Sequence, residues 1–181
     1  MATPELLALQ ALCAKLDGAG IEYMLTGSLA ASYYASPRMT RDIDLVVALE
    51  AEGMSKLTSV LGEDYHVDKD LLAEGFRQRR PCNVVHMPTL VKIDLIPRKD
   101  SDYRRLEFRR RREVDFAGVP LWIVSPEDLV LSKLEWARES RSEQQMKDVR
   151  ALLGTSLDRA YLNEWAGRLG LAGLLKEASG D

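Results

Sequence analysis

One segment decides the fold of this chain: Asp42-Ile43-Asp44-Leu45-Val46-Val47-Ala48-Leu49. Its β-branched and apolar residues predict a buried strand, even though it contains two acids. Asp42 and Asp44 stand two residues apart, so in a strand their carboxylates project from one face, with Cα atoms ~6.6 Å apart. Two carboxylates held this closely on an apolar sheet repel each other and are costly to desolvate. The segment therefore predicts a compensating cation or strong hydrogen-bond donors, and a divalent metal would serve.

A third acid stands inside another apolar segment. Residues 82–87 and 90–96 predict an antiparallel strand pair, and Asp94 lies in the second strand. Three carboxylates on neighbouring strands suit two Mg²⁺ ions ~4 Å apart, which activate an attacking oxygen and stabilise a leaving pyrophosphate. In the alternative interpretation, Asp42 pairs with Arg38 or Arg41, and all three acids lie at the rim of the sheet.

Upstream of the paired acids, Gly27 and Ser28 stand where a predicted strand, residues 21–26, meets a predicted helix, residues 29–35. Backbone N–H groups and the positive end of a helix face outward at such a junction, and glycine has no Cβ to obstruct a phosphate. The alternative is that Gly-Ser is an ordinary helix entry.

The rest of the chain predicts an α+β fold in which a mixed sheet with flanking helices precedes a helical tail. Residues 1–124 form the expected core, and residues 125–181 form a C-terminal helical region packed on it. Ser125 as N-cap, Pro126 at the first helical position and Asp128 predict the start of that region. Four helices are expected there, over residues 126–139, 143–153, 158–169 and 171–178. Residues 104–112 are ambiguous between a helix and an edge strand.

The composition is that of one ordinary globular domain. The chain has 181 residues, 46% hydrophobic and 29% charged, which fits neither disorder nor a disulfide scaffold. No basic leader followed by an apolar stretch begins it, and no apolar run approaches the ~20 residues that span a bilayer. A cytoplasmic location without membrane partners is therefore the expectation.

The net charge of −3 conceals a segregation of charge. Residues 77–112 carry twelve Lys and Arg against four Asp and Glu, a net charge of +8. Such a segment could steer RNA or a triphosphate toward the acids, but charge runs are commonly solvated faces, and aromatic residues between these charges are few. Trp136, in the tail, falls at helical spacing and is expected in the core.

Taken together, the motifs resemble those of a known superfamily. Gly27-Ser28, thirteen intervening residues, the paired acids and Asp94 resemble the nucleotidyltransferase signature of the DNA polymerase β-like superfamily. Residues 38–44, the Ser-Pro-Glu-Asp-Leu motif at 125–129, Lys133 and the Lys-Asp pair at 147–148 are similar to the AbiEii and MenT type of nucleotidyltransferase. That type is associated with toxin–antitoxin and phage-defence systems.

The resemblance implies a polymerase β-like fold and roles for eight residues. Three of them would bind metal and act in catalysis: Asp42, Asp44 and Asp94. The other five would bind nucleotide: Gly27, Ser28, Arg41, Lys133 and Asp148. Alternatives stay open for two of these, because Lys133 could be a solvated lysine and Asp148 could pair with Lys147 or Arg150 on an exposed face.

The implied activity is transfer of a nucleoside monophosphate from an NTP such as ATP to an acceptor hydroxyl, with Mg²⁺ or Mn²⁺ as cofactor. The acceptor would be tRNA or a partner protein, in a toxin–antitoxin or phage-defence setting. The alternative is a non-catalytic, nucleotide-binding or antitoxin-like regulatory module with the same fold. Neither the base of the NTP nor the oligomeric state follows from the sequence.

Overall fold

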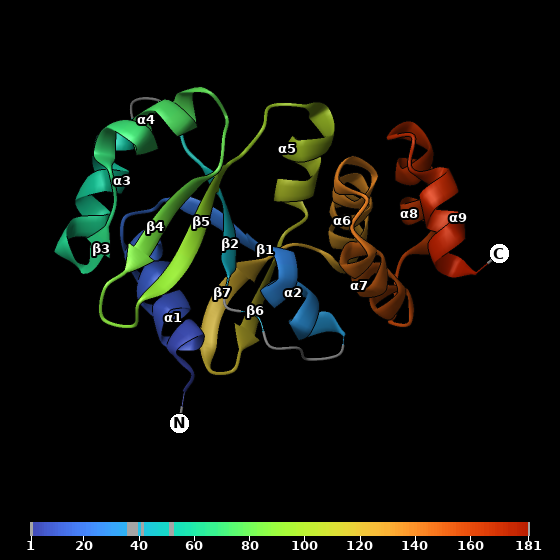
Figure 1. The fold of residues 1–181 in the computed structure, drawn as a ribbon, viewed down its shortest axis with the longest axis horizontal. Coiled ribbons are helices and arrows are strands. Elements are labelled where there is room, and N and C mark those ends of the chain that lie inside the picture. Colours follow the sequence, from blue (N-terminus) through green and yellow to red (C-terminus); the bar gives the residue numbers. More distant parts are fainter. Residues whose placement is uncertain (1, 36–39, 41, 51–52, 181) are drawn as a thin grey trace.

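The computed structural model describes residues 2–35, 40, 42–50 and 53–180. A seven-stranded mixed sheet with helices on both faces forms its centre, and the C-terminal helices lie together at one end (Figure 1). The strand order is β3-β4-β5-β2-β1-β7-β6. The strands are β1 (Glu22–Thr26), β2 (Ile43–Ala48), β3 (Tyr65–His66), β4 (Cys82–His86), β5 (Val91–Pro97), β6 (Arg112–Phe116) and β7 (Val119–Ile123). The expected α+β fold is confirmed.

Strand β2 is central to the sheet. It runs antiparallel to β1 and parallel to β5, and β1 in turn runs parallel to β7. The register places Asp44 beside Thr26 of β1 on one side and beside Asp94 of β5 on the other. Two acids that are fifty residues apart in the sequence are thereby made direct neighbours.

The two faces of the sheet differ because side chains alternate along each strand. On one face, Tyr23, Leu25 and Leu45 are fully buried, and helix α1 (Pro4–Gly18) packs against β1, β5 and β7. The Tyr23 hydroxyl donates a hydrogen bond to Asp17 of that helix, at 3.1 Å. Asp44 has the opposite parity to Leu45, so its carboxylate lies on the face away from α1.

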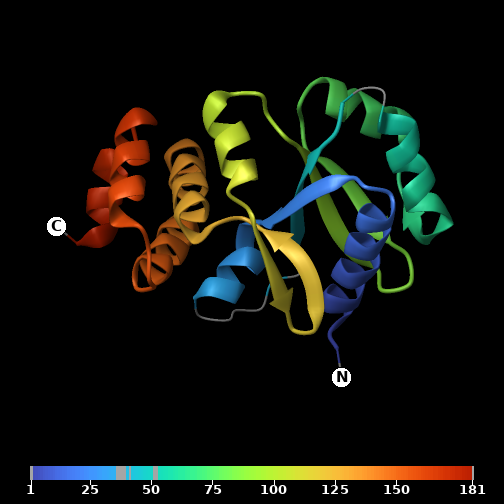
Figure 2. The same ribbon diagram turned by 180° about the vertical axis from the view of Figure 1, so that it is seen from behind.

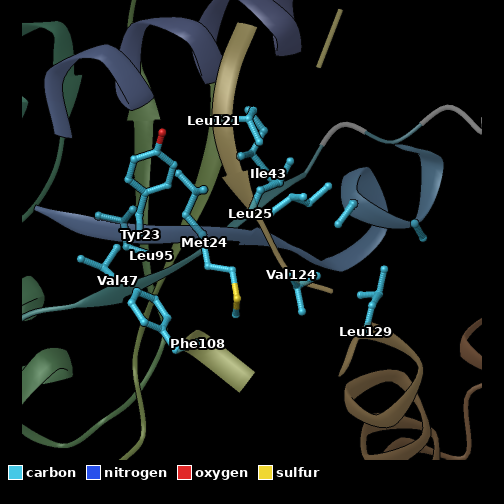
Figure 3. Close-up of a cluster of buried hydrophobic side chains, with 14 of the residues drawn as sticks. Tyr23, Met24, Leu25, Ile43, Val47, Leu95, Phe108, Leu121, Val124 and Leu129 are labelled. Carbon is cyan, nitrogen blue, oxygen red and sulfur yellow. The ribbon is translucent and has the colours of Figure 1, made fainter. Parts of the chain in front are cut away.

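The face away from α1 is only partly covered by apolar side chains. Figure 3 shows Met24 and Phe108 on that side, with Leu129 beside the end of β7. Phe108 belongs to α5 (Asp102–Arg109), and Leu129 belongs to α6 (Pro126–Ser140). A cleft on this face is lined by residues of the strands and of α6.

The remaining helices form the outer cover, which is also visible from behind (Figure 2). They are α2 (Gly27–Tyr34), α3 (Met54–Leu61), the 3₁₀ turn η2 (Gly62–Asp64), α4 (Lys69–Arg77), α7 (Glu143–Leu153), α8 (Arg159–Arg168) and α9 (Ala172–Ser179). The tail helices match their predicted ranges to within a residue or two. Ser125 caps α6 as expected, because its Oγ accepts a hydrogen bond from the Asp128 backbone N–H at 3.2 Å.

Two local predictions need correction, one stretch left undecided is resolved, and one short strand is new. Strand β2 begins at Ile43, so Asp42 lies just before it; its partner β1 stops at Thr26 because the chain turns into α2 at Gly27. Helix α2 therefore starts two residues earlier than expected. The ambiguous arginine-rich stretch contains both elements, since α5 ends at Arg109 and β6 begins at Arg112. Strand β3 has two residues and was not predicted.

No helix within the described ranges is both long and apolar enough to cross a membrane.

Candidate active site

A cleft of about 600 Å³ opens on the face of the sheet away from α1. Six of the eight predicted site residues line it: Gly27, Ser28, Asp42, Asp44, Asp94 and Lys133. Asp148 does not line the cleft but contacts Lys133. The remaining candidate, Arg41, lies outside the described residues, as does Arg38. The fold thus brings together side chains that extend over more than one hundred residues of sequence.

The pairing of Asp44 with Asp94 forms the floor of this cleft. In-register residues on adjacent strands lie ~4.8 Å apart, so the two carboxylates share one patch of sheet. Burial, followed by repulsion from Asp94 and from Asp42, raises the pKa of Asp44 from 3.8 to about 6. The protein thus holds this carboxylate where its negative charge is unfavourable, as expected of a group that awaits a cation.

Asp42 lies at the edge of the same patch. Its side chain is 62% exposed, and its Oδ1 is 3.8 Å from the Lys92 ammonium. The same ammonium is 3.2 Å from Oδ2 of Asp94. In the described part of the chain, no group of three or more His, Cys, Asp or Glu side chains has the arrangement of a metal site. The Lys92 ammonium thus lies between Asp42 and Asp94, two of the three predicted metal ligands.

The carboxylate oxygens are nevertheless suitable ligands for a hard divalent cation. Asp94 Oδ1 is buried and has no hydrogen-bond partner within the described ranges. A buried carboxylate oxygen without a donor is costly, and coordination by a cation would satisfy it. Carboxylate oxygens are ligands that Mg²⁺ and Mn²⁺ prefer, whereas zinc sites are built mainly from thiolate and imidazole. Asp44 and Asp94 are therefore the residues that would hold the metal, with Asp42 beside them.

Gly27 joins the carboxylates to helix α2. Its φ of +67° is unfavourable for residues with a side chain, and an added Cβ would lie 1.9 Å from Asp44 Oδ2. Only glycine therefore allows the backbone to approach Asp44 this closely. The first N–H groups of α2 begin at this point, and Ser28 lines the cleft in the same turn. The predicted strand-to-helix junction is therefore present at Gly27 and Ser28, and phosphate binding there stays a prediction.

Lys133 and Asp148 form a buried ion pair between α6 and α7. Lys133 Nζ is 2.7 Å from Asp148 Oδ2 and also donates to Gln145 Oε1 at 3.0 Å. Both side chains are more than nine-tenths buried, so the interpretations of Lys133 as a solvated lysine and of Asp148 as an exposed acid are wrong. Asp148 instead orients the ammonium group of a lysine that lines the cleft.

Trp136 was expected in the core, but the structure shows that this prediction is wrong. Its side chain is 59% exposed and lines the cleft. Leu129, Ser132, Lys133 and Trp136 stand at i, i+3, i+4 and i+7 of α6, so they form one stripe along the cleft. Trp136 lies at the edge of the buried face of α6, and helical spacing alone does not separate this edge from the core.

The basic segment, residues 77–112, is used largely within the fold. Arg104 contacts Glu107 at 2.8 Å, and Arg110 contacts Asp128 at 3.0 Å. Further arginines of the segment form ion pairs with Asp100, Glu22 and Glu127. Four of its cations also line the cleft: Arg79, Arg98, Lys99 and Arg104. Most of these cations thus pair with acids, some inside the segment and some elsewhere in the chain.

Comparison with known proteins places this architecture in a class. No protein-family model matches the sequence, and no curated protein matches it in sequence. Solved structures do match in fold, at sequence identities that carry no information beyond the fold. The chain has the fold of the polymerase β-like nucleotidyltransferases, a seven-stranded mixed sheet with a helical tail.

Three of the similar structures illustrate the range of that class. The antibiotic-resistance factor ANT(2'')-Ia has a TM-score of 0.57 at 16% identity, over 97% of each chain. The lincosamide antibiotic adenylyltransferase LnuA, bound to lincomycin, has a TM-score of 0.56 at 14% identity, over 86% of this chain and 99% of that one. An antigenic nucleotidyltransferase-like protein from Paracoccidioides brasiliensis has a TM-score of 0.58 at 16% identity, over 98% and 93%.

Proposed function

We propose that the protein is a nucleotidyltransferase that transfers a nucleoside monophosphate from an NTP to an acceptor hydroxyl. One observation carries the proposal: Asp44 and Asp94 stand in register on adjacent parallel strands, next to a glycine whose missing Cβ lets the backbone approach them closely. The fold shared with nucleotidyltransferases supports this interpretation of the cleft.

The residues of the cleft divide the chemistry among them. The first turn of α2, at Gly27 and Ser28, and the Lys133 ammonium would bind the triphosphate. Asp94 would accept the proton of the acceptor hydroxyl while the hydroxyl oxygen forms a bond to the α-phosphorus of the NTP. The bond from that phosphorus to the β-phosphate oxygen breaks, and pyrophosphate leaves. Holding both reactants in the cleft would supply much of the acceleration.

The cofactor we propose is Mg²⁺ or Mn²⁺, held by Asp44 and Asp94 with Asp42. When bound, it supplies positive charge against the triphosphate and the attacking oxygen. Trp136 offers an exposed ring on the same wall as Lys133, and we assign it to stacking on the nucleobase, since any base presents a π-face.

The acceptor that we favour is a hydroxyl of a small molecule. ANT(2'')-Ia is an antibiotic-resistance factor and LnuA is a lincosamide antibiotic adenylyltransferase, and the present chain covers nearly all of both. The basic segment, which could have bound RNA, is mostly paired within the fold. The acceptors implied by the AbiEii and MenT resemblance, tRNA or a partner protein in a toxin–antitoxin setting, are the competing outcomes of the test below.

The test is transfer of label from NTPs that carry ³²P at the α-phosphate. Wild type and an Asp42→Asn/Asp44→Asn variant would each be incubated with Mg²⁺ and one of three acceptor pools: total RNA, cellular protein or a small-molecule extract. We expect label in the small-molecule fraction with wild type alone. Label in RNA or protein would assign the other acceptors. Nucleotide binding without any transfer would instead favour the non-catalytic module.

A further inference from the structure

Lys92 stands at the entrance to the metal-binding carboxylates and has no role in the chemistry above. It precedes Asp94 by two residues in β5, so both side chains project from the same face of the sheet. Its ammonium lies 3.2 Å from Asp94 and 3.8 Å from Asp42, and its side chain is 45% exposed. The Lys92 ammonium thus connects Asp94, in β5, to Asp42, in the loop before β2.

The surroundings of Lys92 complement those of Asp44. The Lys92 ammonium is paired with Asp94 and Asp42, the two carboxylates whose repulsion acts on Asp44. Lys133, which lines the cleft, is directed instead to Asp148 and Gln145.

We propose that Lys92 is a built-in counter-ion of the metal site, whose ammonium holds Asp42 and Asp94 until a divalent cation displaces it from both. The inference rests on the proposed function insofar as these carboxylates bind metal. A cation that must displace an ammonium binds more weakly, by the free energy of the two ion pairs that it breaks. A triphosphate contributes further oxygen ligands, so metal would bind more readily together with NTP than alone.

Binding of Mn²⁺ without nucleotide, followed by electron paramagnetic resonance of the free ion, tests this role. Lys92→Met keeps the aliphatic stem and removes the charge. We expect it to tighten Mn²⁺ binding about threefold to tenfold, as exposed ion pairs of this kind allow. Lys92→Arg keeps the cation and should leave the affinity within about twofold of wild type.

Lys99→Met is the matched control for net charge, because Lys99 lines the cleft but has no ion pair in the described part of the chain. It should leave the Mn²⁺ affinity within about twofold of wild type. Melting curves check the fold of every variant, and Lys92→Gln replaces Lys92→Met if the latter does not fold.

The outcomes separate the two proposals. Equal or weaker Mn²⁺ binding by Lys92→Met, while Asp44→Asn abolishes binding, would overturn the role of Lys92 and leave the proposed function intact. Tightening by Lys99→Met to the same extent would also overturn it, because net charge alone would then explain the effect. If wild type binds Mn²⁺ no more strongly than Asp44→Asn does, the proposed metal site is wrong, and so is the inference about Lys92.

Discussion

Asp128 and the cleft acids Asp44 and Asp94 are removed from water in opposite surroundings: the first among hydrogen-bond donors, the other two beside each other. Asp128, at the start of α6, is fully buried and surrounded by donors: Ser125 Oγ at 2.6 Å, Tyr161 Oη at 2.7 Å, Arg110 Nε at 3.0 Å and Tyr103 Oη at 3.2 Å. Asp44 and Asp94, in the cleft, are placed beside each other, and one oxygen of Asp94 is buried without a donor in the described part of the chain.

Their contacts separate an acid that stabilises the fold from acids that are proposed to act in the cleft. The contacts of Asp128 join α5, α6 and α8, so its charge fixes the helical tail to the core. The raised pKa of Asp44 indicates that its charge is unfavourable in the fold, and a protein keeps such groups where function requires them. Variants in the two groups should therefore separate stability from activity.

The largest effect is expected from Asp44→Asn. Loss of one carboxylate of the proposed metal site should reduce nucleotidyl transfer at least ~1,000-fold, since charge stabilisation by a bound metal is worth several kcal/mol. The raised pKa means that folding disfavours the ionised form, so the charge is unfavourable for stability at pH 7. The free energy of unfolding should therefore be unchanged or raised by at most ~3 kcal/mol. Urea titration and the labelling assay measure the two effects, and lost stability would refute this assignment.

Asp128→Asn should show the reverse pattern. It removes a buried charge and leaves Arg110 and two tyrosine hydroxyls poorly paired, at a cost of ~3 kcal/mol of unfolding free energy. For a chain of this length the melting temperature should fall by roughly 10 °C. Glu177→Gln, on an exposed face of α9, is the control and should change the stability by less than ~0.5 kcal/mol. A variant as stable as wild type would show that the contacts of Asp128 are dispensable.

Gly27→Ala brings the comparison into the cleft itself. The new Cβ meets Asp44 at a backbone conformation that alanine disfavours, so stability should fall by ~2 kcal/mol and transfer should fall as Asp44 is displaced. Gly167→Ala is the matched control: this glycine lies inside α8 with nothing near an added Cβ, and alanine there should be neutral or stabilising by up to ~1 kcal/mol. Equal effects of the two substitutions on transfer would contradict the geometry.

Trp136→Ala should have the smallest effect. Loss of a stacking platform is worth ~1–3 kcal/mol per base, which corresponds to a KM for NTP at least about fivefold higher with kcat little changed. Leu71→Ala, on exposed α4 outside the cleft lining, is the control and should leave KM unchanged. A fall in kcat without any change in KM would assign Trp136 to the acceptor or to the reaction itself.

Much of the fold could be predicted from the sequence because its signals are local. The Ser-Pro start of α6 and the apolar periodicity of the tail depend on neighbouring residues, and the structure confirms those elements. The start of the paired-acid strand was misplaced at Asp42: pairing with β1 ends at Asp44, and pairing with β5 ends at Ile43. The residues of a strand do not show where its neighbours in the sheet begin or end.

The candidate site could be predicted only in part, for a related reason. The types and spacing of Asp42, Asp44 and Asp94 indicate charge on a sheet, whereas the register that pairs Asp44 with Asp94 arises from strands remote in sequence. The partners of Lys133 and Lys92 depend on how elements pack, which the sequence does not display. The metal and nucleotide roles of these residues stay predictions.

The most direct test of the division between functional and structural acids measures transfer of α-labelled nucleotide per folded molecule. It compares Asp44→Asn with Asp128→Asn at a temperature where circular dichroism shows both folded. We predict that Asp44→Asn melts at or above the wild-type temperature and transfers no label, whereas Asp128→Asn melts lower and transfers label at nearly the wild-type rate. Wild-type transfer by Asp44→Asn, or equal loss of transfer in both variants, would contradict that division.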